Sequence, residues 1–420
     1  CQYKMLLLVV FFFTLQNAFA QVLLPAIVKH AGVHYERLLQ IDTLLKDYVN
    51  KNQLAGAVVI IVKDNQVAYY KGHGYSDLSG KKPMPADAIF RIMSQTKAIT
   101  SLGIMQLFEQ GKLSLDQPVS DFIPAYKNPT LIKTFNAADS GFTTTPASRE
   151  ITIRDLLTHT SGLDYPAIGN DTMQAVYAKN NIPSGLGYFN ENLLSRMKAL
   201  GGLPLRHNPG ERFTYGLNSD LLGCLIEIIS GESLETYFRK YIFEPLGMKD
   251  NWFNLPATRA ARLATVYTED KSQKIIEWSP GFRSIDPAYP LIPKNYFSGG
   301  AGLSSTAFDY AVFLQMLLNG GSYNGKQILG KRTVELMLSA QGDHLLGDDD
   351  FCLGFALTSK KSAAANMRNA GSFAWGGYYG TYYWADPKEK MICLIMTQHT
   401  PNSHYEFVDK ISNIIYGSLK

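Results

Sequence analysis

The sequence predicts an α+β protein in which the two ends of the chain build one sheet and a mostly helical segment is inserted between them. Strand-like apolar segments cluster near the beginning and near the end of the chain, and helix-like segments broken by glycine and proline fill the middle. Strands far apart in the chain are expected to share one core when each alone is too small to bury its apolar face. The strand-like segments are 55–62, 67–71, 299–305, 351–358, 373–385 and 391–398.

The elements of the first half follow from apolar periodicity and turn residues. Apolar residues at helical spacing predict a first helix over 36–50. Asp64-Asn65 separates the first two strands and predicts a hairpin turn. A helix is predicted over 94–110, and the Thr-, Ser- and Asn-rich stretch 127–150 is expected to be a loop. Another helix is expected around Ile153, Leu156 and Leu157.

The second half of the insertion contains shorter elements. Short helices with Gly and Pro breaks are predicted over 164–210, a helix over 219–230 that Gly231 ends, and an irregular stretch over 254–296. The late strands enclose a helix over 306–319. A last amphipathic helix, about 403–417, is predicted from Phe407, Val408, Ile411 and Ile415.

Composition and charge exclude several classes. The chain has 420 residues, of which 46% are hydrophobic and 18% are charged, so it can bury a sizeable core and is not a disordered chain. Its formal net charge of +4 is small, and it has no run of Lys or Arg. We therefore expect no nucleic-acid partner.

Residues 1–20 have the pattern of a cleavable signal peptide. Lys4 precedes an apolar run from Met5 to Leu15, and Ala18-Phe19-Ala20 provides a small-x-small cleavage site. The run is too short to span a bilayer, and no later segment resembles a transmembrane helix. We expect cleavage after Ala20 and a periplasmic or secreted protein; a buried N-terminal strand is the alternative.

The cysteines predict neither a disulfide scaffold nor a zinc site. Cys1 would be removed with the signal peptide, which leaves Cys224, Cys352 and Cys393, without Cys-x-x-Cys spacing. All three have apolar neighbours and are expected to be small buried hydrophobes. A bridge between Cys352 and Cys393 stays open at this point.

Ser94-Gln95-Thr96-Lys97 is the first candidate for chemistry, at the head of a predicted helix. Residues i and i+3 share a helix face, with Cβ atoms roughly 5–6 Å apart. A serine hydroxyl is a weak nucleophile until a base removes its proton, and a lysine one turn away can be that base. Four residues with two fixed positions are a weak signal alone.

Two further motifs strengthen the Ser-x-x-Lys signal. Tyr215, in Phe213-Thr214-Tyr215-Gly216-Leu217-Asn218-Ser219-Asp220, precedes an apolar helix, where its hydroxyl can point into a cleft and act as a general base. Taken alone, it would more often be a half-buried packing residue.

The third motif is Trp375-Gly376-Gly377-Tyr378, in a strand-like segment. Adjacent glycines in a strand allow close approach of a ligand, and a backbone N–H there can form half of an oxyanion hole. A bulge in a plain strand is the alternative reading of these glycines.

Together with their surroundings, the three motifs resemble the serine β-lactamase and penicillin-binding-protein superfamily, and within it the class C β-lactamase-like esterases called family VIII carboxylesterases. The resemblance extends over about residues 36–418. The stretches that carry it include Phe90-Arg91-Ile92, Gln110-Gly111-Lys112-Leu113-Ser114-Leu115-Asp116, Ile153-Arg154-Asp155-Leu156-Leu157-Thr158-His159-Thr160-Ser161-Gly162-Leu163, Pro209-Gly210, Pro245-Leu246-Gly247-Met248 and Gly299-Gly300-Ala301-Gly302-Leu303.

The resemblance implies a three-layer, α/β/α-like fold of the β-lactamase/transpeptidase type, with a mainly antiparallel sheet flanked by helices. The catalytic domain would then be 36–418, with a sheet region of 36–113 plus 297–418 and a mostly helical insertion of 114–296.

It also implies roles for individual residues. Ser94 would be the acylated nucleophile, and Lys97 and Tyr215 would share the proton transfers, with Tyr215 activating the deacylating water. The backbone N–H groups of Ser94 and Tyr378 would form the oxyanion hole. Trp375, Gly376 and Gly377 would contact the substrate, at the position where many relatives have Lys-Thr-Gly, and Asn218 would contact it as well.

Two departures from the family pattern favour an esterase over a β-lactamase. The tyrosine motif is usually Tyr-x-Asn, whereas here Leu217 stands third and Asn218 follows, so the amide expected to bind substrate is displaced by one residue. Trp375 replaces a lysine that would bind a substrate carboxylate. A tryptophan side chain is a better partner for an uncharged ester than for a substrate with a carboxylate.

The predicted function is therefore hydrolysis of small carboxylic esters, or of amides, through an acyl-Ser94 intermediate, with no cofactor and no metal. A β-lactamase, a D-aminopeptidase or a D-Ala-D-Ala carboxypeptidase is the first alternative, and a non-catalytic relative that binds peptidoglycan is the second. No Gly-x-Ser-x-Gly elbow and no His-Glu-x-x-His occurs in the sequence. His159, in the family context, is expected to be structural.

Overall fold

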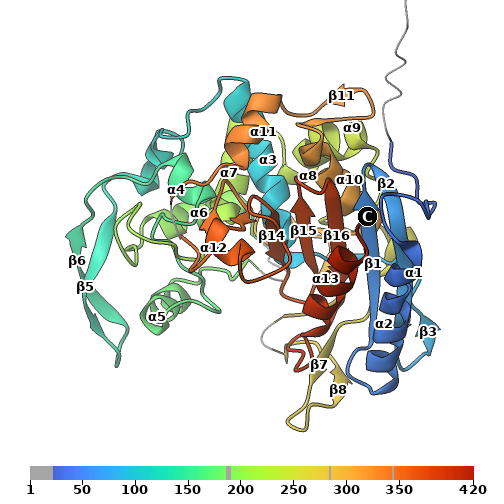
Figure 1. The fold of residues 1–420 in the computed structure, drawn as a ribbon. Helices are drawn as coiled ribbons and strands as arrows, with labels where there is room; N and C mark the ends of the chain where they lie inside the picture. The colour runs from blue at the N-terminus through green and yellow to red at the C-terminus, as the bar shows by residue number, and fades with distance from the viewer. Residues whose placement is uncertain (1–21, 186–190, 283–284, 343–344) are drawn as a thin grey trace, which may run out of the picture.

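An eight-stranded antiparallel sheet organises the chain (Figure 1). The computed structural model describes residues 22–185, 191–282, 285–342 and 345–420. The strand order is β12-β13-β14-β15-β16-β1-β2-β3, so the last strand of the chain pairs with the first in the middle of the sheet. The strands are β1 Gly56–Lys63, β2 Gln66–Asp77, β3 Lys82–Pro83, β12 Asp350–Phe351, β13 Ala356–Leu357, β14 Phe373–Gly376, β15 Tyr382–Asp386 and β16 Met391–Met396.

The central strand β1 is covered on both faces. Val58 and Ile60 belong to the larger apolar core, while Val59 and Ile61 belong to a second core on the opposite face. Side chains of a strand alternate between faces, so an uninterrupted apolar run implies helices on both sides. The predicted hairpin to β2 is present, with Asp64 and Asn65 at φ +50° and +59°, as a two-residue turn of this hand requires.

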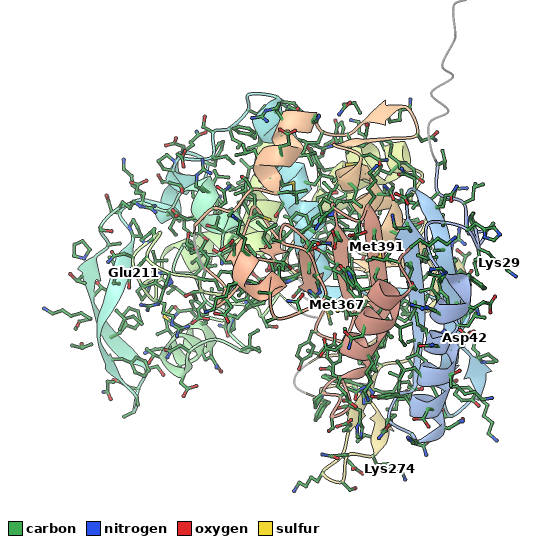
Figure 2. All side chains as sticks on the ribbon, in the orientation of Figure 1. Lys29, Asp42, Glu211, Lys274, Met367 and Met391 are labelled. Atoms are coloured by element: carbon green, nitrogen blue, oxygen red, sulfur yellow. The ribbon has the colours of Figure 1, made fainter. Side chains whose placement is uncertain are left out.

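One helical layer contains both ends of the described chain. It consists of α1 (Tyr35–Leu38), α2 (Gln40–Asn50) and α13 (Phe407–Gly417), which lie side by side on the sheet in Figure 1. The backbone N–H of His34 donates to the carbonyl of Ser418 at 2.7 Å. Asp42, labelled in Figure 2, ties α2 to the sheet through a 2.6 Å ion pair with Lys71 of β2. The helices predicted over 36–50 and 403–417 are therefore present.

The other layer is the helical insertion together with α10. Its central helix α3 (Thr96–Glu109) is buried from Thr96 to Leu107, which places it inside the larger core. A helix that is apolar on all sides is expected to be surrounded by protein. The remaining α-helices are α4 Ile153–Leu157, α5 Asp171–Lys179, α6 Leu193–Gly201, α7 Asn218–Ser230, α8 Leu234–Phe238, α9 Glu244–Leu246, α10 Ala307–Leu318, α11 Lys331–Met337 and α12 Lys360–Ala363, with a π-helix at Arg239–Phe243. Gly231 ends α7 in the left-handed conformation, as expected.

Three sequence-based expectations are corrected. The loop expected over 127–150 contains a hairpin of β5 (Thr130–Asn136) and β6 (Gly141–Pro146), which lies far from the main sheet in Figure 1. The polar threonines of this segment predict a loop, but their β-branched side chains also favour strands.

The irregular stretch 254–296 likewise contains a small hairpin of β7 (Tyr267–Glu269) and β8 (Ile275–Glu277), with 3₁₀ turns at Ala257–Arg262 and Tyr289–Leu291. Of the strand expected over 299–305, only β9 (Ser304–Ser305) forms, and it pairs with β4 (Phe90–Arg91) outside the main sheet. The remaining short elements are β10 Ser322–Tyr323, β11 Lys326–Gln327 and 3₁₀ turns at Met93–Gln95, Val119–Asp121 and Pro124–Tyr126.

Two further expectations concern cysteines and membranes. Cys352 and Cys393 are buried and free, as is Cys224, so the bridge left open by the sequence is not formed. Within the described ranges, no helix is long and apolar enough to cross a bilayer. The expected signal peptide, residues 1–20, lies outside the described residues.

Candidate active site

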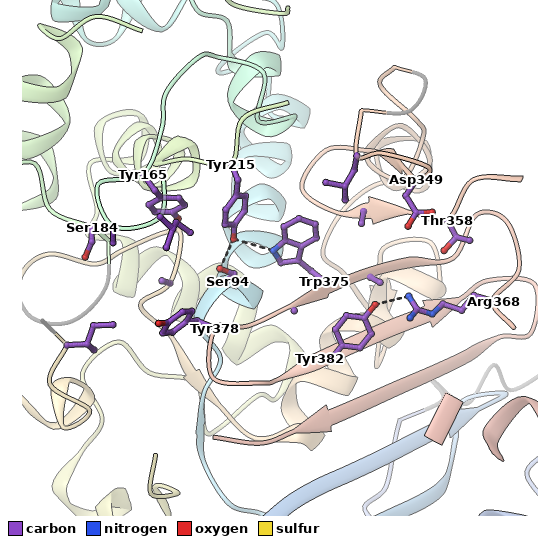
Figure 3. A pocket seen from close by; sticks show the side chains of 18 residues that line it. Ser94, Tyr165, Ser184, Tyr215, Asp349, Thr358, Arg368, Trp375, Tyr378 and Tyr382 are labelled. Carbon is purple, nitrogen blue, oxygen red and sulfur yellow. Dashed lines mark hydrogen bonds between the residues drawn. The ribbon is translucent and has the colours of Figure 1, made fainter. Parts of the chain in front are cut away.

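Ser94 opens onto a cavity of about 810 Å³ (Figure 3). It lies in the 3₁₀ turn Met93–Gln95 that leads into α3, and Met93 directly before it has φ +48°. A left-handed backbone at a non-glycine residue is strained and often marks a functional position. The lining residues are Ser94, Tyr165, Ala167, Ile168, Ser184, Tyr215, Ile285, Ala301, Leu346, Asp349, Ala356, Thr358, Arg368, Ala374, Trp375, Gly376, Tyr378 and Tyr382.

Lys97 lies one helical turn after Ser94 and is almost completely buried. Its Nζ donates to three oxygens: Ser94 Oγ at 3.2 Å, Tyr165 Oη at 3.0 Å and the Gly300 carbonyl at 2.8 Å. An ammonium group has three N–H donors, so this set of acceptors matches its full capacity.

Tyr215 meets Ser94 from the other side. Its hydroxyl donates to Ser94 Oγ at 2.6 Å, and the Trp375 indole N–H donates to Tyr215 Oη at 3.4 Å. Lys97 Nζ lies 4.6 Å from the centre of the Tyr215 ring. The structure therefore brings three residues from two separate motifs into one hydrogen-bonded group, in which Ser94 Oγ accepts from both partners.

Tyr165 is a site residue that sequence reasoning missed. It lines the cavity, and its hydroxyl is held by Lys97. Burial, followed by the nearby Tyr215 and Asp220, raises the pKa of Tyr165 well above 10, so it stays a neutral hydroxyl. The available signal was position alone, because Tyr165 follows the family-like stretch that ends at Leu163.

The third motif forms the opposite wall. Trp375 and Gly376 lie at the end of β14, and Tyr378 follows in the next turn; all three line the cavity. Gly377 has a different role, because a Cβ there would lie 2.4 Å from the Ile92 carbonyl. The missing side chain lets this strand end pack directly against the segment that leads to Ser94.

Asn218, for which a substrate contact was expected, is not among the residues that line the cavity. Its side chain is fully buried, outside the cavity, and bonded to Ser161 Oγ and to His159 Nδ1 at 2.9 Å. It is the first residue of α7, and a shift of one position along a helix turns a side chain by roughly 100°. Asn218 therefore supports the site from behind instead of facing it.

His159 also lies behind the site. Its ring is 5.0 Å from that of Tyr215, and it is absent from the cavity lining. Burial, with a smaller contribution from Lys97, lowers the pKa of His159 well below 6.5. It is consequently neutral and packs against the Tyr215 ring, as a structural residue would.

The cavity itself is mostly apolar and aromatic. Among the described residues that line it, Asp349 and Arg368 are the charged ones, and Arg368 donates to Tyr382 Oη at 2.7 Å. Both lie beyond Trp375 as seen from Ser94 in Figure 3. In the described parts of the chain, no group of three or more His, Cys, Asp or Glu side chains is placed to hold a metal ion.

Comparisons with known proteins find one matching family and several similar proteins. The β-lactamase family model matches residues 41–415. Protein Rv1367c of Mycobacterium tuberculosis (strain ATCC 25618 / H37Rv) is 31% identical over 372 residues, which cover 85% of this chain and 89% of that protein. Esterase EstB of Burkholderia gladioli is 27% identical over 380 residues, covering 87% and 91% respectively.

Solved structures show the same fold. EstCE1, described as a hydrolase with promiscuous acyltransferase activity, superposes with a TM-score of 0.81 at 27% identity, covering 91% of this chain and 99% of EstCE1.

Proposed function

The chain belongs to the β-lactamase family, and we propose that it is a serine hydrolase that cleaves small carboxylic esters through an acyl-Ser94 intermediate. The observation that carries this proposal is the 2.6 Å hydrogen bond from Tyr215 to Ser94 Oγ at the edge of an apolar cavity. Lys97, bonded to the same Oγ, completes the group.

The reaction follows from this geometry in two halves. Tyr215 lines the cavity, where its hydroxyl must first give up its own proton to water; as a phenolate it then takes the proton of Ser94 while Oγ attacks the ester carbonyl. The backbone N–H groups of Ser94 and Tyr378 stabilise the negative oxygen of the tetrahedral intermediate. As the C–O bond to the alcohol breaks, Tyr215 returns the proton to the departing oxygen. The products of this half are a free alcohol and an ester of Ser94.

The second half repeats these steps with water. Tyr215 takes a proton from the water, whose oxygen attacks the acyl carbonyl, and then returns a proton to Ser94 Oγ. The carboxylic acid leaves and the enzyme is restored. In the first half Tyr215 carries a proton from Ser94 to the alcohol, and in the second half from water to Ser94.

Trp375 and Asn218 favour an ester over a β-lactam or a D-Ala-D-Ala peptide. Trp375 offers no charge to a substrate carboxylate close to Ser94, and its indole N–H is directed at Tyr215. The Asn218 amide is engaged behind the site. Aromatic and aliphatic walls suit an uncharged acyl or alkyl group.

Hydrolysis of p-nitrophenyl butyrate, with Ser94→Ala in parallel, tests the proposal. We expect the unmodified protein to hydrolyse p-nitrophenyl butyrate and Ser94→Ala to be inactive. Nitrocefin turnover by the unmodified protein should be far below its ester turnover. Nitrocefin or D-Ala-D-Ala cleavage above ester cleavage would support the first alternative. A protein that turns over none of these but binds peptidoglycan fragments would support the second.

We also propose that residues 1–20 are a signal peptide cut after Ala20 and that the mature protein is periplasmic or secreted. The apolar run Met5–Leu15 and the Ala18-Phe19-Ala20 sequence support this. Expression in a bacterial host followed by intact-mass measurement of the exported protein tests it. An N-terminus at Gln21 is expected; protein retained in the cytoplasm with residues 1–20 attached would refute it.

A further inference from the structure

The catalytic cavity continues past Trp375 to a polar end. Asp349, Thr358, Arg368 and Tyr382 line this polar end, and in Figure 3 they lie on one side of Trp375 with the nucleophile on the other. The other described residues that line the cavity are neutral. The proposed proton transfers take place at the nucleophile and use neither charged residue, so the charges at the polar end have another role.

Arg368 is held in place by two aromatic rings. Its Cζ lies 5.3 Å from the centre of the Tyr382 ring and 5.3 Å from that of Trp384, and its side chain donates to Tyr382 Oη at 2.7 Å. The next residue, Asn369, donates from Nδ2 to the buried carboxylate of Asp386 at 2.9 Å and anchors the backbone there. The guanidinium is therefore positioned before a ligand arrives, which reduces the entropy lost on binding.

The guanidinium of Arg368 has donors to spare. It carries five N–H donors, and among the described residues it makes one side-chain hydrogen bond, to Tyr382, and no ion pair. Arg154 and Arg262, by contrast, are paired with aspartates. Tyr382 Oη accepts from Arg368 and keeps its own hydrogen to donate, and the Thr358 hydroxyl lies at the same end. Donors that face a cavity in this way suit an anionic ligand.

Asp349 limits the charge of that ligand. It lines the same polar end, and its Oδ1 accepts from the backbone N–H of Ser359 at 3.3 Å. Coulomb repulsion grows with the charge of the ligand, and a phosphate group carries about −1.5 to −2 at pH 7. A carboxylate has a single charge, and its two oxygens match the planar fork of Arg368. A carboxylate therefore fits this end better than a phosphate does.

The position of Tyr215 indicates which half of the substrate reaches the polar end. Tyr215 Oη accepts from the Trp375 indole N–H at 3.4 Å, so it lies on the Trp375 side of Ser94. In the proposed reaction Tyr215 returns a proton to the alcohol oxygen, which must come within hydrogen-bond reach of it. The alcohol therefore leaves toward Trp375. Gly376, the next residue, pairs with Tyr382 on the adjacent strand, about 5 Å away.

We propose that Arg368, together with Tyr382, binds a carboxylate on the alcohol part of the substrate, so that the enzyme acts on esters of hydroxy acids. The ester group lies beside the uncharged Trp375, and the carboxylate lies about one strand farther along the sheet. Cleavage leaves the acyl group on Ser94 and releases a hydroxy acid whose carboxylate is at Arg368. The inference rests on the proposed function, since it names the substrate class of that reaction.

A matched pair of substrates tests this preference. The pair is 3-(4-butyryloxyphenyl)propionate and its primary amide, which differ in charge but hardly in shape, and release of the phenol is followed by absorbance. We expect kcat/KM to be about 10–100-fold higher for the carboxylate, the range for a hydrogen bond to a charged group. The gain should be in KM, because a contact far from the scissile bond stabilises ground and transition states alike. An equal or higher value for the amide would overturn the proposal.

Two charge-removing variants should move this selectivity ratio in opposite directions. Arg368→Met removes the cation and should lower the ratio of carboxylate to amide kcat/KM to about one, whereas Asp349→Asn removes the nearby anion and should raise it. Arg332→Met is the control, because Arg332 is an exposed residue of α11, paired with Glu335 and outside the cavity lining. It should leave the ratio unchanged. An unchanged ratio in Arg368→Met, or an equal fall in Arg332→Met, would contradict the proposal.

Two milder variants decide the case if Arg368→Met does not fold. Arg368→Lys keeps the charge but loses the planar fork, and Tyr382→Phe keeps the ring but removes the hydroxyl that Arg368 contacts. Both should lower the ratio, and the thermal unfolding midpoint shows whether each protein is intact. Folded variants that both retain the full ratio would refute the proposal.

A second pair of substrates tests the placement on the alcohol side. Mono-p-nitrophenyl glutarate carries its carboxylate on the acyl part, and p-nitrophenyl butyrate is its uncharged counterpart. Arg368→Met should change the ratio for this pair less than the ratio for the hydroxy acid pair. A larger change would mean that Arg368 faces the acyl part, and it would overturn the assignment.

A binding measurement separates failure of this inference from failure of the ester proposal. The ligand is 3-(4-hydroxyphenyl)propionate, with its amide as the reference, titrated into Ser94→Ala and into Ser94→Ala/Arg368→Met by calorimetry. We expect tighter binding of the acid than of the amide, and loss of that difference without Arg368. A protein that binds the acid in this way but cleaves no ester would refute the ester proposal alone. Ester cleavage without an effect of Arg368 on acid binding would refute this inference alone.

Discussion

The Tyr215 hydroxyl donates a 2.6 Å hydrogen bond to Ser94 Oγ, although the two residues are 121 positions apart. Ser94 stands at the head of α3 and Tyr215 just before α7, and both helices contribute to the same buried core. The contact is consequently held by two packed helices and forms without a bound substrate.

Ser94→Ala should abolish ester turnover and leave the fold unchanged. The Oγ is the only atom removed, and it faces a cavity, so little packing is lost. Turnover of p-nitrophenyl butyrate and the thermal unfolding midpoint check both parts. Ser101→Ala, a serine two turns further along α3, is the control and should retain activity. Activity that survives in Ser94→Ala would remove the serine from the mechanism.

Tyr215→Phe should lower kcat by about 10²–10⁴-fold, the usual range for a positioned acid or base, with a small effect on KM. Tyr165→Phe is the comparison, because Tyr165 reaches Ser94 only through Lys97 and should lose less. Steady-state kinetics of both variants, which give kcat and KM, test this prediction. A larger loss of kcat in Tyr165→Phe than in Tyr215→Phe would mean that Tyr165, and not Tyr215, is the acid or base.

Trp375→Lys should shift selectivity toward substrates with a carboxylate. The new ammonium would stand beside Tyr215, whose ring centre is now 5.6 Å from that of Trp375. We expect the ratio of nitrocefin to p-nitrophenyl butyrate kcat/KM to rise at least tenfold. Trp375→Leu, which removes the ring without adding charge, should not raise it. An unchanged ratio in the lysine variant would mean that this position does not contact the substrate.

Gly299→Ala should destabilise the protein by about 1–3 kcal/mol, the range for an overfilled core. A Cβ at this position would lie 2.4 Å from the Ser219 carbonyl, which belongs to the backbone of α7 and cannot rotate away. Urea unfolding measures the change. Gly417→Ala is the control, since nothing lies within 4 Å of its Cβ position at the end of α13. It should be neutral or slightly stabilising.

His399 should make the protein less stable in acid. Burial lowers its pKa to about 4, against a partial opposite effect of Glu269. The unfolded chain takes up this proton near pH 6.5 and the folded chain only near pH 4, so the stability is complete above pH 6.5 and is lost as the pH falls toward 4. The loss is about 3 kcal/mol for this residue. His399→Gln should show a flatter dependence in urea unfolding between pH 4.5 and 7; an equal slope would contradict it.

The strands and the Ser94–Lys97 pair were predictable because their signals are local, whereas the role of Tyr215 followed from the family resemblance. Ser94 and Lys97 share a face through helical spacing alone, and the strands at both ends are continuous apolar runs. Tyr165 and the burial of Asn218 were not predictable in this way. Their positions depend on how the segment after α4 packs on α7, a long-range contact that no spacing in the sequence encodes. The Thr130–Pro146 hairpin was missed because polar composition was given more weight than β-branching.

The pairing of β1 with β16 has a consequence for how the protein is made. The middle of the sheet joins Val58 to Met396, so a growing chain holds its first strands without their central partner until almost all 420 residues have been synthesised. Closing a loop of this length makes folding slow relative to a helical bundle and leaves an apolar strand edge exposed meanwhile. Nascent chains truncated before Met391 should accordingly be protease-sensitive and bound by chaperones, whereas the finished chain brings its two ends together beside α1 and α13.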